Sequence, residues 1–259
     1  MKIPEKAVRR VFGRRAWQYT TSVSHTDPQG LAKVVKLSSP ELNWSALDVA
    51  TGTGHTAFAL APHVASVTGI DLTPEMLNEA EKLRTERSIT NVDFLIADIH
   101  HLSFADETFH LITCRRAAHH FSDIFLALRE MKRVLRRSGR LVIEDRSGPE
   151  NDFVDAFMNK LNRYHDESHV RQYRPSHWRR MLEELGFAVA EVEPYIKHRP
   201  LASLTDGVSQ ENVRKIHAML DRLNDSHREA FNLAEVNGHL HLNHWYVRIS
   251  AQRKYDFVP

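Results

Sequence analysis

The chain of 259 residues contains a single cysteine, Cys114, so no disulfide can form within it. Unpaired thiols fit a reducing compartment, and we therefore expect a cytoplasmic protein. Glycine and proline are sparse, at ten residues each, which excludes the collagen-like and proline-rich disordered classes. No apolar run approaches the ~18–20 residues that span a bilayer, so membrane residence is not expected.

A strong excess of one charge is also missing. The formal net charge is +2, so the total does not imply a nucleic-acid partner. Basic residues do gather near the N-terminus, which could indicate a transit peptide or a basic arm. Apolar residues share this segment, and they favour a helix that closes over a pocket: Val8, Val11, Phe12, Trp17 and Tyr19.

The most informative stretch is residues 47–72, LDVATGTGHTAFALAPHVASVTGIDL. It predicts an apolar strand, a glycine-rich turn, a short helix and a second strand that ends at Asp71. Gly52 and Gly54 lack Cβ atoms, so backbone N–H groups of the turn can approach a ligand. Asp71 lies about 20 residues beyond Asp48, where a doubly wound fold places the carboxylate that binds a ribose. The two features together predict a nucleoside pocket.

The spacing of small residues leaves more than one ligand open. The turn reads Ala50-x-Gly52-x-Gly54, and Ala57 stands where a dinucleotide-binding fold has its last small residue. A nicotinamide-dependent oxidoreductase is therefore one alternative. A tight turn without any ligand is another.

Strands and helices alternate through the first half of the chain. Residues 92–96, 110–114 and 140–144 are predicted as strands three to five, and helices are expected after Thr73 and after Ser122, the second ending at Gly139. This alternation predicts a parallel sheet with helices on both faces.

In the second half of the chain, the predicted strands and helices follow one another in a different order. Helices are predicted at residues 151–164 and 176–185, followed by strand six at 187–192 and a mostly helical stretch at 201–232. The dipeptide Asn237-Gly238 predicts a hairpin, and residues 245–253 alternate as a last strand. We divide the chain into an N-terminal helical lid (1–43), a Rossmann-like core (44–200), and a helical cover with the C-terminal hairpin and last strand (201–259).

The D-x-A-x-G-x-G turn, the lead-in FADETF at residues 104–109 and the phrase CRRAAHHF at 114–121 resemble class I S-adenosylmethionine (SAM)-dependent methyltransferases of the small-molecule type. The likeness is nearest to the branch of ubiquinone and menaquinone biosynthesis enzymes. It implies an α/β fold with a doubly wound seven-stranded sheet, mostly parallel with an antiparallel last strand, plus a helical cover. It also implies methyl transfer from SAM to an O- or C-nucleophile of a small molecule. His110 replaces an aspartate that is usual in this family.

The resemblance carries a set of cofactor residues. Asp71 is expected to bind the ribose, Asp98 the adenine amino group with Ile99 against the ring, Tyr19 the methionine end, and Arg115 to act through its backbone. The full set comprises Tyr19, Asp48, Ala50, Gly52, Gly54, Asp71, Leu72, Asp98, Ile99 and Arg115.

His119 and His120 follow the fourth strand, where the family presents the transferable methyl group. Either is a candidate general base, since histidine titrates near neutral pH, and we prefer His119; a role in orienting the loop is the alternative. A polar link contributes candidate contacts to an anionic or phenolic acceptor, or else is merely solvated: His165, His169, Arg171 and Tyr173.

The histidine spacings at 165/169 and 239/241 would suit a metal, but no Cys or Glu cluster completes either, so no metal is expected. We expect a small-molecule acceptor, no nucleic-acid partner, and a monomer or homodimer. A tRNA or protein methyltransferase and a non-catalytic SAM-binding partner subunit remain alternatives.

Overall fold

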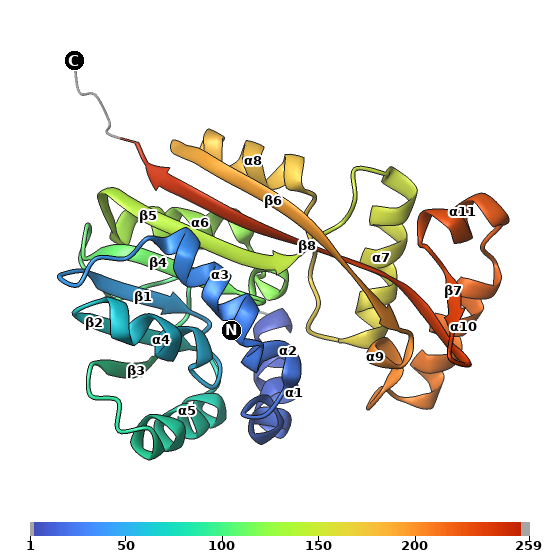
Figure 1. Cartoon of the computed structure of the whole chain (residues 1–259), viewed down its shortest axis with the longest axis horizontal. Coiled ribbons are helices and arrows are strands. Elements are labelled where there is room, and N and C mark those ends of the chain that lie inside the picture. The colour runs from blue at the N-terminus through green and yellow to red at the C-terminus, as the bar shows by residue number, and fades with distance from the viewer. Residues whose placement is uncertain (1–2, 255–259) are drawn as a thin grey trace.

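A computed structural model describes residues 3–254, so the outermost residues of the predicted lid and of the last segment (1–2 and 255–259) lie outside the described part. Its centre is a twisted sheet in the order β3-β2-β1-β4-β5-β8-β6, with β7 paired only to β8 (Figure 1). The strands are β1 (Ser45–Val49), β2 (Ser66–Asp71), β3 (Val92–Ile96), β4 (Phe109–Arg115), β5 (Leu135–Arg146), β6 (Phe187–Pro200), β7 (Ala234–Val236) and β8 (His239–Arg253).

The predicted doubly wound sheet is confirmed. Strands β1 to β5 pair in parallel, and β8 lies antiparallel between β5 and β6. The chain runs from β1 outward to β2 and β3 and then returns to place β4 on the other side of β1. Such a reversal opens a crevice at the carboxyl ends of the strands, where open α/β sheets bind ligands.

Helices cover both faces of this sheet. Val34 of α3 (Pro28–Ser38) and Phe58 of α4 (His55–Leu60) pack with Ala46 and Val142 on one face. The opposite face packs against α6 (Ile124–Val134) and α8 (Pro175–Glu184). Helix α5 (Pro74–Glu86) flanks β2 and β3, and short 3-10 turns follow α4 and β4: η1 (Ala61–His63) and η2 (Ala118–His120).

The ends of α6 differ from the prediction. Asp123, not Ser122, caps the helix, because its carboxylate accepts from the backbone N–H of Leu126 at 2.9 Å. The helix stops at Val134 rather than at Gly139, because Leu135 already pairs with Phe109 at the start of β5.

The last two long strands exceed their predicted lengths. β6 continues through Pro194 to Pro200, which is possible because β6 is an edge strand, where a proline nitrogen can face the unpaired side without removing a ladder bond. β8 joins the second arm of the predicted hairpin to the last strand predicted at 245–253, and the hairpin pairs Val236 with His239.

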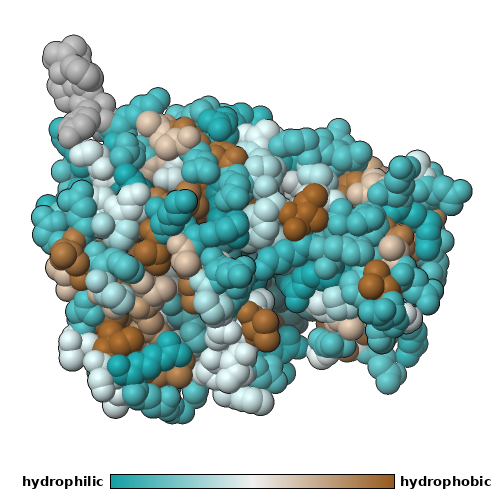
Figure 2. Space-filling view, viewed as in Figure 1, coloured by the Kyte–Doolittle hydropathy of each residue, from teal (hydrophilic) through white to brown (hydrophobic). Residues whose placement is uncertain are grey.

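The extended β6–β8 ribbon carries a second lobe, seen at the right of Figure 1. This lobe contains α7 (Asp152–His165), α9 (Ala202–Thr205), α10 (Gln210–Asp221) and α11 (Asp225–Ala230). Its small core surrounds the fully buried ring of Phe231. Figure 2 shows a mainly hydrophilic surface over the lobe and a hollow at the lower edge between the lobe and the main body.

Helices α1 (Ile3–Tyr19) and α2 (Val23–Thr26) lie beside this hollow, below the carboxyl ends of the strands in Figure 1. The guanidinium of Arg10 donates to both carboxylate oxygens of Glu167, at 3.0 and 2.6 Å, and Arg15 donates to the carbonyl of Gly207 at 2.9 Å. Helix α1 therefore bridges the two lobes. Within the described residues, no helix combines the length and apolarity that crossing a membrane requires.

Candidate active site

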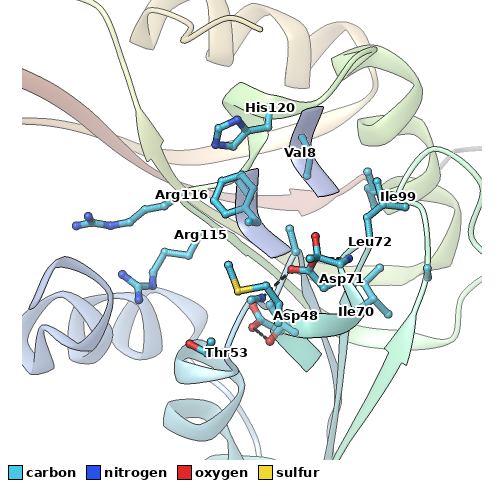
Figure 3. A pocket seen from close by; sticks show the side chains of 18 of the residues that line it. Val8, Asp48, Thr53, Ile70, Asp71, Leu72, Ile99, Arg115, Arg116 and His120 are labelled. Carbon is cyan, nitrogen blue, oxygen red and sulfur yellow. Dashed lines mark hydrogen bonds between the residues drawn. The ribbon is translucent and has the colours of Figure 1, made fainter. Parts of the chain in front are cut away.

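A cavity lies at the carboxyl ends of β1, β2 and β4, and helices α1 and α2 close its open side. Figure 3 shows Asp48 and Asp71 together at one end, Arg115 and Arg116 extending side by side, and His120 above them. The lining includes nine of the ten predicted cofactor residues; Gly54 is the exception. Of the two predicted catalytic histidines, only His120 lines the cavity.

The glycine-rich turn shapes the floor of the cavity. Gly52 has a φ of +56°, and a Cβ atom added there would meet no protein atom within 4 Å, so the backbone is open to a ligand. Gly54 has a φ of +84°, and a Cβ there would strike the rings of Phe58 and Phe94. Gly54 thus permits close packing below the turn. Ala50 also adopts a positive φ, 51°, which is strained for a residue with a Cβ.

Asp48 supports this turn from beneath. Its buried carboxylate accepts from the hydroxyls of Thr51 at 2.6 Å and Thr113 at 2.7 Å, which ties the turn to β4. Burial raises the pKa of Asp48 to about 6, although the two threonine hydrogen bonds oppose that shift. The geometry gives Asp48 a positioning role for the turn.

Asp71 is fixed by backbone donors on either side of it. Its carboxylate oxygens accept from the N–H groups of Gly52 and Thr73, each at 2.9 Å. Burial raises its pKa, and these two hydrogen bonds offset part of the effect. Since a carboxylate has about four acceptor positions, both oxygens keep capacity for further donors such as ribose hydroxyls.

Asp98 forms a local network with His100. One carboxylate oxygen accepts from the His100 backbone N–H at 2.9 Å and from Nδ1 at 2.7 Å. Burial alone would raise the pKa of Asp98, but these hydrogen bonds lower it overall. Among the described residues, Glu5 joins this pair in a group with metal-ligand spacing. Both His100 nitrogens already have partners, because Nε2 accepts from the N–H of Asp123 at 3.3 Å, so we assign the group to hydrogen bonding.

Arg115 contributes its side chain to the lining, whereas the sequence suggested a backbone role. Nε donates to the Thr56 hydroxyl at 3.0 Å, and Nη2 donates to the carbonyl of His25. Nη1 is buried without a hydrogen-bond partner, 3.9 Å from the nearest Glu144 oxygen. A guanidinium in the wall of the cavity suits a carboxylate ligand, such as the one at the methionine end of SAM. The open backbone at Gly52, the spare acceptor positions of Asp71 and the positive charge of Arg115 fit that cofactor.

The two adjacent histidines have different surroundings. His119 is buried, and its Nδ1 lies 2.6 Å from Asp145, which also accepts the His119 backbone N–H at 2.8 Å. Burial raises the pKa of Asp145 to about 7 and holds that of His119 well below its usual value. His120 packs edge-on against Phe12 and places Nδ1 3.1 Å from the carbonyl of Ser168. A ring nitrogen beside a carbonyl carries the proton, which leaves Nε2 of His120 as the acceptor.

The four predicted acceptor contacts do not line the cavity. His169 lies behind His119, and its pKa falls to about 2, chiefly because it is buried. Nδ1 of His165 forms a hydrogen bond with the carbonyl of Leu204 in the second lobe. Arg171 stacks on Tyr173 and reaches Asp155, away from the pocket. The loop around them packs behind the site.

Several pocket residues were not predicted from the sequence, among them His25, Thr56 and Arg116. His25 stands in a short helix and Thr56 lies within the α4 sequence, and neither belongs to a motif with a recognisable spacing. Arg116 directly follows Arg115, and the position of Arg115 at the end of β4 is the only sequence feature that could have indicated Arg116 as a pocket residue. Its φ of 59° is strained for a side-chain-bearing residue.

The sheet order, with an antiparallel β8 between β5 and β6, and the acid at the end of β2 fit a class I SAM-dependent methyltransferase. Residues 41–186, more than half of the chain, match the family described as "Methyltransferase domain". The chain belongs to this family. The nicotinamide oxidoreductase and the ligand-free turn, both open from the spacing alone, are thereby wrong.

Similar proteins agree with this assignment. The uncharacterized methyltransferase YcgJ of Bacillus subtilis (strain 168) is 36% identical over 184 residues, covering 71% of this chain and 73% of that protein. Its crystal structure superimposes with a TM-score of 0.82 and 31% identity, covering 87% of this chain and 98% of that one. A demethylmenaquinone methyltransferase of Thermotoga maritima is 44% identical over 100 residues, but this match covers only 38% of this chain and 41% of the relative.

Proposed function

We propose that this methyltransferase transfers a methyl group to an oxygen or carbon nucleophile of a small-molecule acceptor by in-line displacement. The observation that carries the proposal is the roof over the cavity. Phe12 and Tyr19 of α1 and His25 of α2 cover the end of the cavity that Arg115 lines. A compact acceptor fits beneath such a roof, whereas a folded RNA or protein would need it to be displaced.

The roles of the lining residues follow from their contacts. Asp71 would accept from the ribose hydroxyls, Asp98 with Ile99 would hold the adenine, and Arg115 would bind the carboxylate of the methionine end. When bound, SAM supplies an activated methyl group on its sulfonium. The protein then has to orient the acceptor and exclude water.

His120 is the proposed general base for an acceptor that must lose a proton. Its Nε2 is the free acceptor nitrogen, and its ring lines the cavity beside Phe12. His119 and Asp145 support the segment from behind through the 2.6 Å contact. This reverses our preference between the two histidines.

A labelled-methyl transfer experiment tests the proposal. Protein and methyl-labelled SAM are incubated with three separate pools: phenols, quinols and small acids; bulk tRNA; and bulk cellular protein. We expect label in a small molecule, no transfer by His120→Ala, and unchanged binding of S-adenosylhomocysteine (SAH) by that variant. Label confined to tRNA or protein would overturn the small-molecule assignment, and full turnover by His120→Ala would overturn the base.

A further inference from the structure

Three arginines converge on one tyrosine beyond the cofactor cavity. Tyr246 of β8 is 2% exposed, and the guanidinium carbon of Arg116 lies 5.4 Å from its ring centre. Arg199 of β6 donates from Nη1 to the phenol oxygen at 3.4 Å. Arg146 of β5 is the direct cross-strand partner of Tyr246, so the two side chains leave the same face of the sheet.

The positive charge of this group is only partly balanced. The Nε of Arg116 lies 3.4 Å from the carboxylate of Glu144, and Arg248 binds the same carboxylate at 2.7 Å. The two cations therefore share one negative charge. Within the described residues, Arg146 and Arg199 have no ion-pair partner in the structure. Arg146 donates instead to the neutral amide oxygen of Asn162 at 2.7 Å.

The electrostatic effect on neighbouring groups agrees with this geometry. Burial alone would raise the pKa of Tyr246, but the charges of Arg146, Arg199 and Arg116 lower it overall. The carboxylate of Asp166, which follows α7, is hydrogen-bonded to Ser168 at 2.6 Å rather than to an arginine. Partly desolvated cations without carboxylate partners are costly unless an anion joins them.

The group adjoins the cofactor cavity at the end opposite Asp98. Arg116 itself lines that cavity, and in Figure 3 its side chain extends beside that of Arg115, away from Asp71. Burial chiefly lowers the pKa of His25, which forms part of the roof, and the charges of Arg116 and Arg146 add to that shift. A molecule held by these arginines would therefore lie beside the methionine end of the cofactor pocket.

We propose that Arg116, Arg146 and Arg199, together with the hydroxyl of Tyr246, bind an oxyanion of the methyl acceptor, either a carboxylate or a phosphate. This assignment rests on the proposed small-molecule methyl transfer and adds the charge of its acceptor. It replaces Arg171 and the other link residues as the source of anion selectivity. A guanidinium pair offers the planar, bidentate donors that both oxyanions accept.

The test uses the full-length protein saturated with SAH and three probes titrated by calorimetry: benzoate, its neutral counterpart benzamide, and phenyl phosphate. Arg146→Gln and Arg199→Gln are compared with Arg129→Gln, which removes an exposed arginine on α6. We expect at least one anionic probe to bind the wild type, and each of the first two substitutions to weaken it by about 10-fold or more. Arg199→Lys should restore part of the loss, and Arg129→Gln should match the wild type.

Preference for benzoate would identify a carboxylate acceptor, and preference for phenyl phosphate a phosphate one. Equal binding of benzamide and benzoate, unchanged anion affinity in both glutamine variants, or no binding of either anion would overturn the inference. SAH affinity is measured first in every variant, and we expect it to be unchanged. Methyl transfer to an uncharged small molecule with no anion binding would reject the oxyanion site but keep the proposed function, whereas transfer only to tRNA or protein would reject the function itself.

Discussion

At the scale of single residues, the site separates groups that would touch the cofactor from groups that hold them in place. Asp48 and Asp71 both lie at the ends of neighbouring strands, but the carboxylate oxygens of Asp48 accept hydrogen bonds from two threonine hydroxyls. Asp71 accepts from backbone N–H groups of Gly52 and Thr73 and keeps acceptor positions free. The two acids therefore differ in expected role.

Replacing Asp71 should weaken cofactor binding. Asp71→Ala would remove two hydrogen bonds to the ribose, worth ~1–1.5 kcal/mol each, so we expect SAH affinity to fall at least about 10-fold. Calorimetric titration measures this change directly. Asp93→Ala, at an exposed acid on β3, is the matched control and should leave the affinity as it is. Equal SAH affinity in Asp71→Ala and wild type would remove the ribose role.

The buried Asp145 should make stability depend on pH. Its pKa is about 7 in the folded protein because of burial, against about 3.9 in an unfolded chain. An acid whose pKa is raised by folding contributes its full stabilisation of the folded protein below about pH 4, and this contribution is lost as the pH rises to about 7. Asp145→Asn cannot titrate, so between pH 5 and 7 the wild type should lose more free energy of unfolding than the variant. Urea unfolding at several pH values tests this, and parallel curves for the two proteins would contradict it.

At the scale of elements, the sequence predicted the sheet and the cofactor turn well because their signals are local. The step from apolar strand to Gly52, and the acid at the end of β2, are short-range patterns that backbone geometry enforces. The ends of the elements were less predictable. Ser122 and Asp123 are both favourable N-cap residue types, and only the backbone conformation at the start of α6 decides which of them caps the helix. Similarly, strand six was predicted to end at residue 192, but β6 continues through Pro194 because an edge position tolerates proline.

The proposed acceptor site could not be read from the sequence because it is assembled from distant strands. Arg116 directly follows β4, whereas Arg146 and Arg199 belong to β5 and β6, and no spacing along the chain connects them. Their meeting at Tyr246 depends on the antiparallel insertion of β8 between β5 and β6. His165 and His169, by contrast, had a suggestive spacing, but α7 ends at His165 and the two side chains take different partners.

The cap of α6 gives a test at this scale. Asp123→Ala removes the acceptor for the Leu126 N–H, so we expect a loss of about 1 kcal/mol in the free energy of unfolding. Ser122→Ala should cost less, since its hydroxyl contacts only side chains, such as Glu5 at 3.2 Å. Chemical denaturation of the two variants compares them. A larger loss from Ser122→Ala would restore the cap that the sequence first suggested.

At the scale of the whole molecule, two hydrophobic cores share the long strand β8. Val247, Ile249 and Ala251 pack in the core of the main body, whereas Leu242 packs in the core of the second lobe. The lobe also meets α1 through Arg10 and Arg15. Exposed ion pairs contribute little stability, about 0–1 kcal/mol each, so the lobe depends mainly on its own small core.

Truncating the centre of that core should therefore loosen one lobe and leave the other intact. Phe231 is fully buried and lies 4.8 Å from the ring of Phe157, so Phe231→Ala should cost about 3–5 kcal/mol locally. We expect faster amide hydrogen exchange across α10, α11 and β7, with β1, β2 and β4 protected and SAH binding retained, because residues 201–254 contribute nothing to the lining of the cofactor cavity. Phe187→Ala, at an equally buried ring in the main core, should instead raise exchange in α8 and β5. If Phe231→Ala accelerated exchange equally in both lobes, the two cores would unfold as one unit, and β8 would transmit the loss of packing along its whole length.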